Sequence, residues 1–388
     1  MVKLRRLTAF GGLVTIAVGA SCRESTGVES RLAPRECWYA ADTGFGRPIP
    51  AMVGSSVVHA TGSNTLVARD TATGARQWET PVTAGLIRGY AMSVGAGVVI
   101  VPLVGRTVGL DGTTGALLWT RTSPDDQGTP GNVFAATPAT DSEYAYIPAW
   151  GASVSAIGLR TGVPGWIWRT PDTASTRAGT TGVAIAGDTV YAAVWKWLTP
   201  TGTVTQQWIV AIHRESGAEL WREVFTAPLQ YVNVRNAPVV AGRVVAFSLT
   251  NGQVFALDRF TRARLWATTE RVGGFAVDDA PLVSGDTIFI PESDRAVTAR
   301  AMSDGRVLWE QRRAQGPGAL ALAGTRLYVG AGPYLSALDR STGRLLWAGR
   351  IPKKPGMPAA LVSMASMRGT AGGRLFVSAN GGTFCLRE

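Results

Sequence analysis

A repeat that ends in tryptophan is the feature that most constrains the fold of this chain. The motif A-L-D-x-x-T-G-x-x-x-W, in more or less complete form, recurs seven times. Self-similarity at a period of this size indicates a repeat architecture, in which one supersecondary unit stacks on the next. Successive tryptophans lie 41, 47, 55, 45, 43 and 38 residues apart, at Trp78, Trp119, Trp166, Trp221, Trp266, Trp309 and Trp347.

Each copy predicts a β-hairpin, with an alternating strand, a turn of Asp, Ser or Thr with Gly, and a second strand that ends in tryptophan. Glycine suits this turn because the backbone there needs a positive φ. Arg262 replaces the glycine in the fifth copy, so we expect that turn to be strained or reshaped. Another hairpin precedes each copy, as in residues 237–248, 280–291 and 318–330. Two hairpins make a four-stranded unit, which is the size of a propeller blade.

The two ends of the chain predict how many blades there are. After Trp347, residues 371–379 and 382–388 supply three strands of another unit, and the chain stops where its tryptophan strand should begin. That strand is present at the other end, where Trp38 lies 40 residues before the first repeat tryptophan. Residues 37–388 then divide into eight units of 44 residues. We predict an all-β, eight-bladed β-propeller of four-stranded antiparallel blades, closed by an N-terminal strand that completes the C-terminal blade.

The N-terminal segment predicts export. Residues 1–6 carry three positive charges, and the apolar stretch at residues 7–20 is too short to serve as a transmembrane helix. We therefore assign a signal peptide to residues 1–21. Small residues before Cys22 are similar to the lipobox of bacterial lipoproteins, in which the cysteine becomes the lipidated first residue. The alternative is ordinary signal cleavage near Ala20, which leaves Cys22 as a free thiol.

Lipidation at Cys22 predicts that residues 22–36 form a flexible tether to a membrane. Arg23 stands where many inner-membrane lipoproteins carry a retaining aspartate, so an outer-membrane anchor facing the periplasm is expected by resemblance. Several acyl chains on one cysteine would hold the protein firmly, because a single chain binds a bilayer only weakly.

The formal charge of +11 comes from 34 arginines and only four lysines. The arginines are scattered, with no run longer than two, which indicates a compositional bias toward arginine. Together with the export signal, this argues against nucleic acid as a partner. Only two histidines are present, so a histidine-rich metal site is excluded.

Two cysteines remain near the ends of the predicted propeller. Ring closure places Cys37 and Cys385 on neighbouring strands, and an oxidising periplasm permits a disulfide between them. Such a bond would lock the ring by restricting the unfolded chain. A register offset of one residue would instead point the two side chains to opposite faces. The alternative is a pair of buried, reduced thiols.

The repeated tryptophans are best explained by packing. One large ring at a fixed position in every blade fills the gap between neighbouring blades, whereas eight symmetric positions cannot all serve one site. The expected blade-packing residues are Trp38, Trp78, Trp119, Trp166, Trp221, Trp266, Trp309 and Trp347.

The repeat resembles the quinoprotein, or PQQ-type, β-propeller repeat over residues 37–388. That superfamily includes PQQ-dependent dehydrogenases and cofactor-free, BamB-type lipoproteins of outer-membrane assembly, which are eight-bladed propellers on a lipid tether. The resemblance implies a non-enzymatic, monomeric propeller without a cofactor, anchored by lipid in the periplasm. It would act as a protein-binding scaffold, and its partner would be an outer-membrane barrel assembly component. The sequence alone does not separate this function from surface-exposed adhesion or sensing.

An alternative function is a small quinoprotein or ligand-binding propeller that holds PQQ and Ca²⁺. Many dehydrogenases of this fold are much longer and carry adjacent cysteines by the quinone, which this chain lacks. Acid pairs are present at residues 125–126 in a loop and at residues 278–279 at the start of a blade's inner strand, but acid pairs in loops are typical of solvated surface charge. With two histidines, base catalysis by imidazole is poorly supported, so no catalytic, cofactor-binding or metal residue is assigned.

One face of the propeller is expected to carry the interaction surface. The connections between second and third strands, and those between blades, leave on the same face and include the long insertions at residues 121–136, 170–180, 195–208, 222–236 and 351–359. Aromatic side chains there could anchor a partner, or Trp195 and Trp197 could share one strand face and pack on the adjacent blade. The candidate interaction residues are Trp195, Lys196, Trp197 and Trp208.

Overall fold

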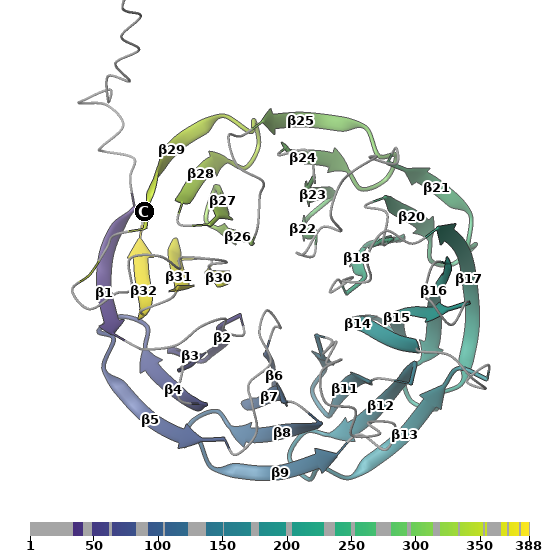
Figure 1. Cartoon of the computed structure of the whole chain (residues 1–388), viewed down its shortest axis with the longest axis horizontal. Coiled ribbons are helices and arrows are strands. Elements are labelled where there is room, and N and C mark those ends of the chain that lie inside the picture. Colours follow the sequence, from purple (N-terminus) through teal and green to yellow (C-terminus); the bar gives the residue numbers. More distant parts are fainter. Residues whose placement is uncertain are drawn as a thin grey trace, which may run out of the picture.

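Eight four-stranded sheets stand around a ring in the computed structural model of the chain (Figure 1). Every pairing within these sheets is antiparallel, and the described residues contain no helix, so the predicted eight-bladed propeller is confirmed. The structure describes residues 34–41, 49–61, 64–82, 92–103, 105–122, 137–149, 151–171, 178–198, 204–228, 237–249, 253–268, 281–292, 296–312, 319–332, 334–351, 354, 366–370, 372–379 and 382–387.

The first four blades follow one another along the chain, each from the centre of the ring to its rim. Blade one contains β2 (Ala51–Val53), β3 (Ser56–Ala60), β4 (Thr65–Asp70) and β5 (Arg76–Pro81). Blade two contains β6 (Ser93–Gly95), β7 (Val98–Leu103), β8 (Arg106–Asp111) and β9 (Leu117–Thr122). Blade three contains β10 (Ala139–Thr140), β11 (Tyr144–Ala149), β12 (Ser153–Gly158) and β13 (Pro164–Arg169). Blade four contains β14 (Ala178–Ala186), β15 (Thr189–Trp197), β16 (Val204–His213) and β17 (Glu219–Pro228).

The remaining blades complete the ring. Blade five contains β18 (Val239–Ala241), β19 (Val244–Ser248), β20 (Val254–Asp258) and β21 (Arg264–Ala267). Blade six contains β22 (Leu282–Ser284), β23 (Thr287–Pro291), β24 (Ala296–Ala301) and β25 (Val307–Arg312). Blade seven contains β26 (Leu320–Ala323), β27 (Arg326–Ala331), β28 (Tyr334–Asp339) and β29 (Leu345–Arg350). Blade eight contains β30 (Ser366–Gly369), β31 (Arg374–Ala379), β32 (Gly382–Arg387) and β1 (Arg35–Ala41).

Blade eight joins the two ends of the chain, as the sequence predicts. Its strand order is β30-β31-β32-β1, so the N-terminal strand forms the rim of the C-terminal blade. One detail of the prediction was wrong. The innermost strand is β30, which lies before residues 371–379, because Gly372 and Gly373 belong to the turn that joins β30 to β31.

The core lies between the blades. Each blade is covered on both faces by its neighbours, so a strand such as β7, with the sequence VVIVPL, is buried along its whole length instead of alternating. Apolar clusters accordingly bridge two blades, as where Val58 of blade one and Val99 of blade two share a cluster. Each fully buried aliphatic side chain stabilises the fold by roughly 1.5–3 kcal/mol. The stability is therefore distributed around the whole ring.

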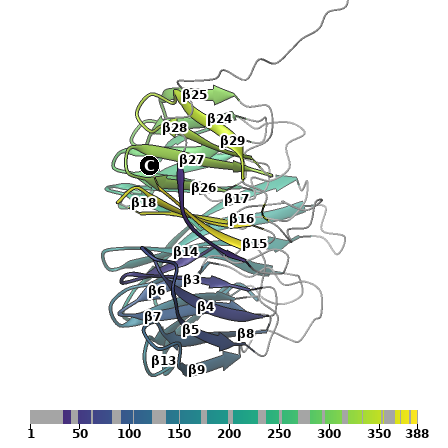
Figure 2. The ribbon, with the colours of Figure 1, turned by 90° about the vertical axis from the view of Figure 1, so that its left-hand side faces the viewer.

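The ring has two different faces, seen edge-on in Figure 2. On the face that we call the turn face, tight turns join the first strand of each blade to the second and, in blades one to seven, the third strand to the fourth. On the opposite face, called the connection face, the second and fourth strands end and the chain passes to the next strand or blade. Among the described residues, no helix has the length and apolarity required to cross a membrane.

The repeat motif encodes the turn between the third and fourth strands. In blade seven, the Asp339 carboxylate accepts hydrogen bonds from the backbone N–H groups of Ser341 and Thr342, at 3.0 and 2.9 Å. Gly343 follows in the left-handed region, with a φ of 71°. Arg262 has a φ of 67° at the same position of blade five. The turn there keeps its shape, so the strain falls on the arginine.

Candidate functional site

The repeat tryptophans lie at the joints between blades. Six of those described donate an indole N–H hydrogen bond to a backbone carbonyl in the third-to-fourth-strand turn of the next blade. The distances range from 2.6 Å for Trp119 to Leu159 to 3.2 Å for Trp38 to Thr71. The donors are Trp38, Trp78, Trp119, Trp166, Trp266 and Trp309. This contact repeats around the ring and provides packing between the blades.

The glycine of each third-to-fourth-strand turn lies against the tryptophan of the preceding blade. A Cβ on Gly343 would lie 2.5 Å from the ring of Trp309, and a Cβ on Gly74 would lie 2.6 Å from Trp38. Glycine is therefore required both for its positive φ and for the close approach of the indole. At the joint between blades four and five, Arg262 occupies this position, and the preceding Trp221 packs on the ring of Tyr191 with 6.0 Å between centroids.

Three of the four residues named as a candidate interaction face are buried. Trp195 is 2% exposed, Trp208 is 3% exposed and Lys196 is 9% exposed, so the structure supports the packing alternative for these side chains. The physical reason is strand length, because β15 and β16 of blade four run for nine and ten residues and carry the W-K-W segment inside the sheet. The side chain of Trp197 lies outside the described residues.

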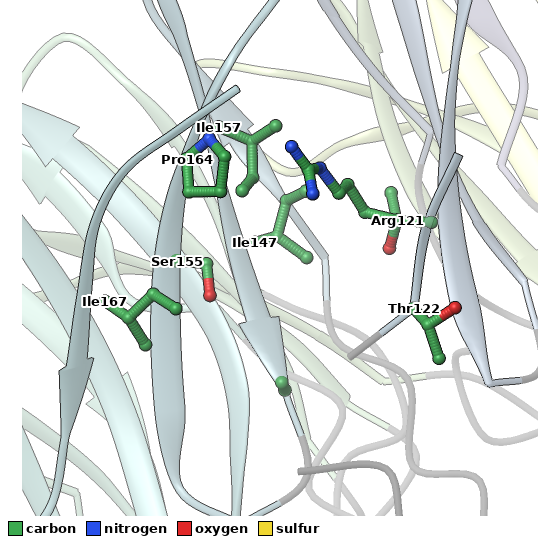
Figure 3. Close-up of a pocket in the computed structure, with 9 residues that line it drawn as sticks. Arg121, Thr122, Ile147, Ser155, Ile157, Pro164 and Ile167 are labelled. Atoms are coloured by element: carbon green, nitrogen blue, oxygen red, sulfur yellow. The ribbon is translucent and has the colours of Figure 1, made fainter. Parts of the chain in front are cut away.

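A cleft opens between blades two and three (Figure 3), with a volume of about 220 Å³. Arg121 of β9 extends into it from one wall, and Ile157 and Pro164 of blade three line the other wall. Ile167 of β13 is 39% exposed at this cleft. The remaining lining residues are Thr107, Thr122, Ile147, Ala149 and Ser155.

One position of the repeat differs between this joint and the next. Two residues after the motif tryptophan, blade two carries Arg121, whose Nε donates to the Gly162 carbonyl of blade three. At the next joint, the corresponding residue is Trp168, which is buried and donates to Glu219 of blade four. An extended arginine thus stands at the joint between blades two and three, where the next joint has a buried indole. Sequence reasoning missed this cleft, because the residue at this repeat position varies from blade to blade.

The described residues contain no group of three or more His, Cys, Asp or Glu side chains that could hold a metal ion. His59 is buried, and its Nδ1 lies 3.2 Å from the Thr383 hydroxyl, whereas His213 caps a turn through Ser216. The acid pairs at residues 125–126 and 278–279 lie outside the described residues, as does Cys22. PQQ with Ca²⁺ therefore remains an alternative from the sequence.

Cys37 and Cys385 meet where the ring closes. A bulge between Glu36 and Trp38 breaks the register of β1 against β32, so Trp38 is the Cα partner of Cys385. Cys37 nevertheless packs against the buried cluster that contains Cys385, and the Cys385 thiol donates to the Thr71 carbonyl at 3.9 Å. Burial and the neighbouring Cys37 raise the pKa of the Cys385 thiol. Both are free thiols in this structure, so the disulfide stays a prediction.

The fold and the tryptophan joints define a β-propeller of the PQQ-type repeat class. The family model described as the outer membrane protein assembly factor BamB matches residues 34–207 and 205–387. The chain therefore belongs to the BamB family. Comparison with curated protein sequences gave no match.

Solved structures with the same fold include both classes suggested by the repeat. BamB from Moraxella catarrhalis matches with a TM-score of 0.65 and 13% identity, over 92% of this chain and 98% of that one. The quinohemoprotein alcohol dehydrogenase from Comamonas testosteroni matches with a TM-score of 0.66 and 14% identity, over 94% of this chain and 78% of that one. The computationally designed protein Ika8 has a TM-score of 0.65 and 16% identity, with coverage of 91% and 100%. At these identities the likeness concerns the fold alone.

Proposed function

We propose that this protein is a non-enzymatic scaffold of the cell envelope, anchored by lipid at Cys22, which binds a protein of outer-membrane barrel assembly. Membership of the BamB family supports this function, and the match covers both halves of the propeller. The export signal and the cysteine at its end support the location. The single structural observation that carries the proposal is the cleft between blades two and three.

The cleft suits a protein partner better than a small polar substrate. Its walls are largely aliphatic, and Ile167 is accessible on the rim of the ring. Arg121 adds a guanidinium that is already oriented by the Gly162 carbonyl. An apolar pocket with one positioned arginine is typical of an interface centre, where an aliphatic or aromatic anchor inserts and a polar group fixes its orientation. The partner segment is therefore expected to present an apolar side chain beside an acceptor.

The neighbouring outer strand adds a second means of recognition. The strand β13 lies at the edge of its sheet, pairing only with β12 on its inner side. An extended segment of a partner could pair with such an edge while its side chains enter the adjacent cleft. Pro164 lies at the first position of β13 and cannot donate to an added strand, so pairing is expected along the part of β13 that follows it.

In-cell crosslinking followed by purification of the tagged full chain tests this proposal. We expect recovery of an outer-membrane barrel assembly protein, and Ile167→Glu should reduce that recovery about tenfold or more, as for an interface hot spot. Leu345→Glu is the matched control, because Leu345 is an exposed aliphatic residue of the outer strand β29 in blade seven. Recovery of the propeller alone, or equal loss from both variants, would contradict the proposal.

A further inference from the structure

Phe260 is the most exposed large apolar side chain among the described residues. It is 62% exposed and lies in the turn between β20 and β21 of blade five, on the turn face. This is the face opposite the connections between blades. A single exposed aliphatic residue is ordinary on a protein surface, but a phenylalanine at the tip of a turn exposes much more apolar area.

Two arginines pack against the ring of Phe260, and each is also hydrogen-bonded to other groups of the protein. The guanidinium carbon of Arg259 lies 4.4 Å from the ring centroid, and that of Arg243 lies 5.8 Å away. Arg243 is oriented by the Asp258 carboxylate at 2.8–3.0 Å, and Arg259 donates to the Gly242 and Ala186 carbonyls. The result is an exposed aromatic ring flanked by positioned cations.

The same turn carries the strained backbone of the chain's repeat. Arg262 adopts a φ of 67°, the same left-handed conformation as the corresponding glycines of the other turns, whose φ values lie between 66° and 74°. Left-handed geometry is unfavourable for an arginine, and strained non-glycine residues concentrate at functional sites. We call Arg243, Arg259, Phe260 and Arg262 the turn-face patch.

The charges of the turn face are unevenly distributed around the ring. Acidic residues predominate on blades two to four, while blade six is balanced, with Arg300 and Arg306 against Asp286 and Asp304. Arginines predominate on the turns and strand ends of blades five, seven and eight. Three acidic residues lie there, namely Asp258, Asp339 and Glu36. The arginines at the same turns and strand ends are Arg35, Arg243, Arg259, Arg262, Arg326, Arg340, Arg344, Arg374 and Arg387.

The N-terminal segment leaves from the same basic side. Strand β1 begins with Arg35 opposite Arg387, at the turn-face end of blade eight, and runs toward the connection face. The chain upstream of β1 therefore joins the propeller on the turn face. A membrane anchor on that segment would therefore be attached to the propeller from this face.

We propose that the turn-face patch docks on the anionic headgroups of a membrane surface, with the Phe260 ring inserted among them and the three arginines on lipid phosphates. An exposed aromatic residue beside arginines is suited to the interface between water and lipid, and charge complementarity supplies the attraction. The inference rests on the envelope location in the proposed function, but it does not require a barrel-assembly partner. It orients the connection face, and the cleft between blades two and three, away from the headgroups.

Photocrosslinking of the full chain in vesicles tests this orientation. A photoreactive residue is placed at Phe260, and in a second protein at Tyr334, which is an exposed aromatic residue at the start of β28 on the connection face. The N-terminal segment is identical in both proteins, so the readout is which face contacts lipid. We expect phospholipid adducts at position 260 in vesicles that contain phosphatidylglycerol. Adducts should be few at position 334, and few at both positions with phosphatidylcholine alone.

Variants that remove arginines test whether the turn-face patch itself binds the lipid or whether the overall positive charge of the protein attracts it. Replacing Arg259 and Arg262 by Gln should lower the adduct yield at position 260 about fivefold per arginine. The control replaces Arg160 and Arg312 by Gln, which removes the same charge from exposed positions on blades three and six. Equal loss in both pairs, lipid adducts mainly at position 334, or only protein adducts at position 260 in cells would overturn the inference. Lipid adducts at position 260 without recovery of a barrel-assembly protein would leave it standing and contradict only the proposed partner.

Discussion

Cys37 packs against the buried cluster that contains Cys385, across the strand pair that closes the ring, although the two residues lie at opposite ends of the chain. The bulge between Glu36 and Trp38 makes this contact possible while Trp38 still docks on the turn of blade one. A bulge sets two residues against one on the partner strand and so re-aims a side chain. Here it brings both cysteines into one cluster at the closing blade.

A disulfide at this position should stabilise the ring, because it would link the two ends of the propeller in the unfolded chain. We expect Cys385→Ser to lower the unfolding temperature under oxidising conditions by several degrees, corresponding to no more than about 4–5 kcal/mol. Thermal unfolding with and without reductant measures this effect, and Cys37→Ser should reproduce it.

An equal loss of stability in reductant would mean that the Cys385 thiol acts through packing alone. Alkylation of the native, reduced protein provides a second measurement. Since burial raises the pKa of Cys385, its reactive thiolate is scarce, and modification should be slow until the protein unfolds.

Replacing Arg262 by glycine should stabilise the propeller. The change removes a left-handed arginine, and the smaller residue permits Trp221 to approach as the other tryptophans do. Relief of about 1–2 kcal/mol is partly offset by the greater entropy of glycine in the unfolded chain, so a net gain of about 1 kcal/mol is expected. Chemical denaturation measures the gain.

The reciprocal control is Gly343→Ala in blade seven. The added Cβ would lie 2.5 Å from the Trp309 ring at a φ of 71°, so strain and overpacking combine. A destabilisation of about 2–4 kcal/mol is expected. If Arg262→Gly were destabilising, Arg262 would have a packing role that outweighs its strain.

The aspartates of the repeat turns should make stability fall in acid. Hydrogen bonds from the Ser341 and Thr342 hydroxyls and backbone amides lower the pKa of Asp339 from 3.8 to about 2. Because the folded-state pKa is depressed, the stabilisation is present above about pH 4 and is lost as the pH falls through about 2. Solvent screening of this exposed carboxylate limits the contribution to about 1 kcal/mol.

Unfolding of the Asp339→Asn variant between pH 7 and pH 2 checks this prediction. The variant should be less stable than the parent at neutral pH, and the two curves should converge in acid. A constant difference across the whole range would show that ionisation of Asp339 contributes nothing.

The architecture could be predicted because its determinants are local and repeated. The turn motif, the spacing of the tryptophans and the strand with Trp38 at the far end together specify eight blades and the way in which they close. The bulge beside Cys37 could not be predicted, because a one-residue register shift depends on how Trp38 packs on its neighbour.

The surfaces were harder to predict than the fold. Arginines that are scattered in sequence come together because the turns of successive blades share one face. The sequence therefore shows only an excess of arginine, whereas the structure shows that arginines predominate on the turn face of blades five, seven and eight. The W-K-W segment is a distinctive string, yet the long strands of blade four bury Trp195. Phe260 and Arg121 stand in ordinary repeat positions, and only the three-dimensional arrangement shows their exposure and the cleft.

The scaffold function and the quinoprotein alternative differ in their response to PQQ. In the presence of Ca²⁺, a quinoprotein of this fold would bind one PQQ per protein molecule. It would also become more stable, because the ligand binds only the folded state. We expect the full chain to show no change in absorbance or unfolding temperature after incubation with PQQ and Ca²⁺, because its sequence lacks the adjacent cysteines that many dehydrogenases of this fold carry by the quinone. A PQQ-dependent alcohol dehydrogenase treated in parallel is the positive control. Stoichiometric uptake with a raised unfolding temperature would contradict the scaffold function and direct attention to the acid pairs at residues 125–126 and 278–279.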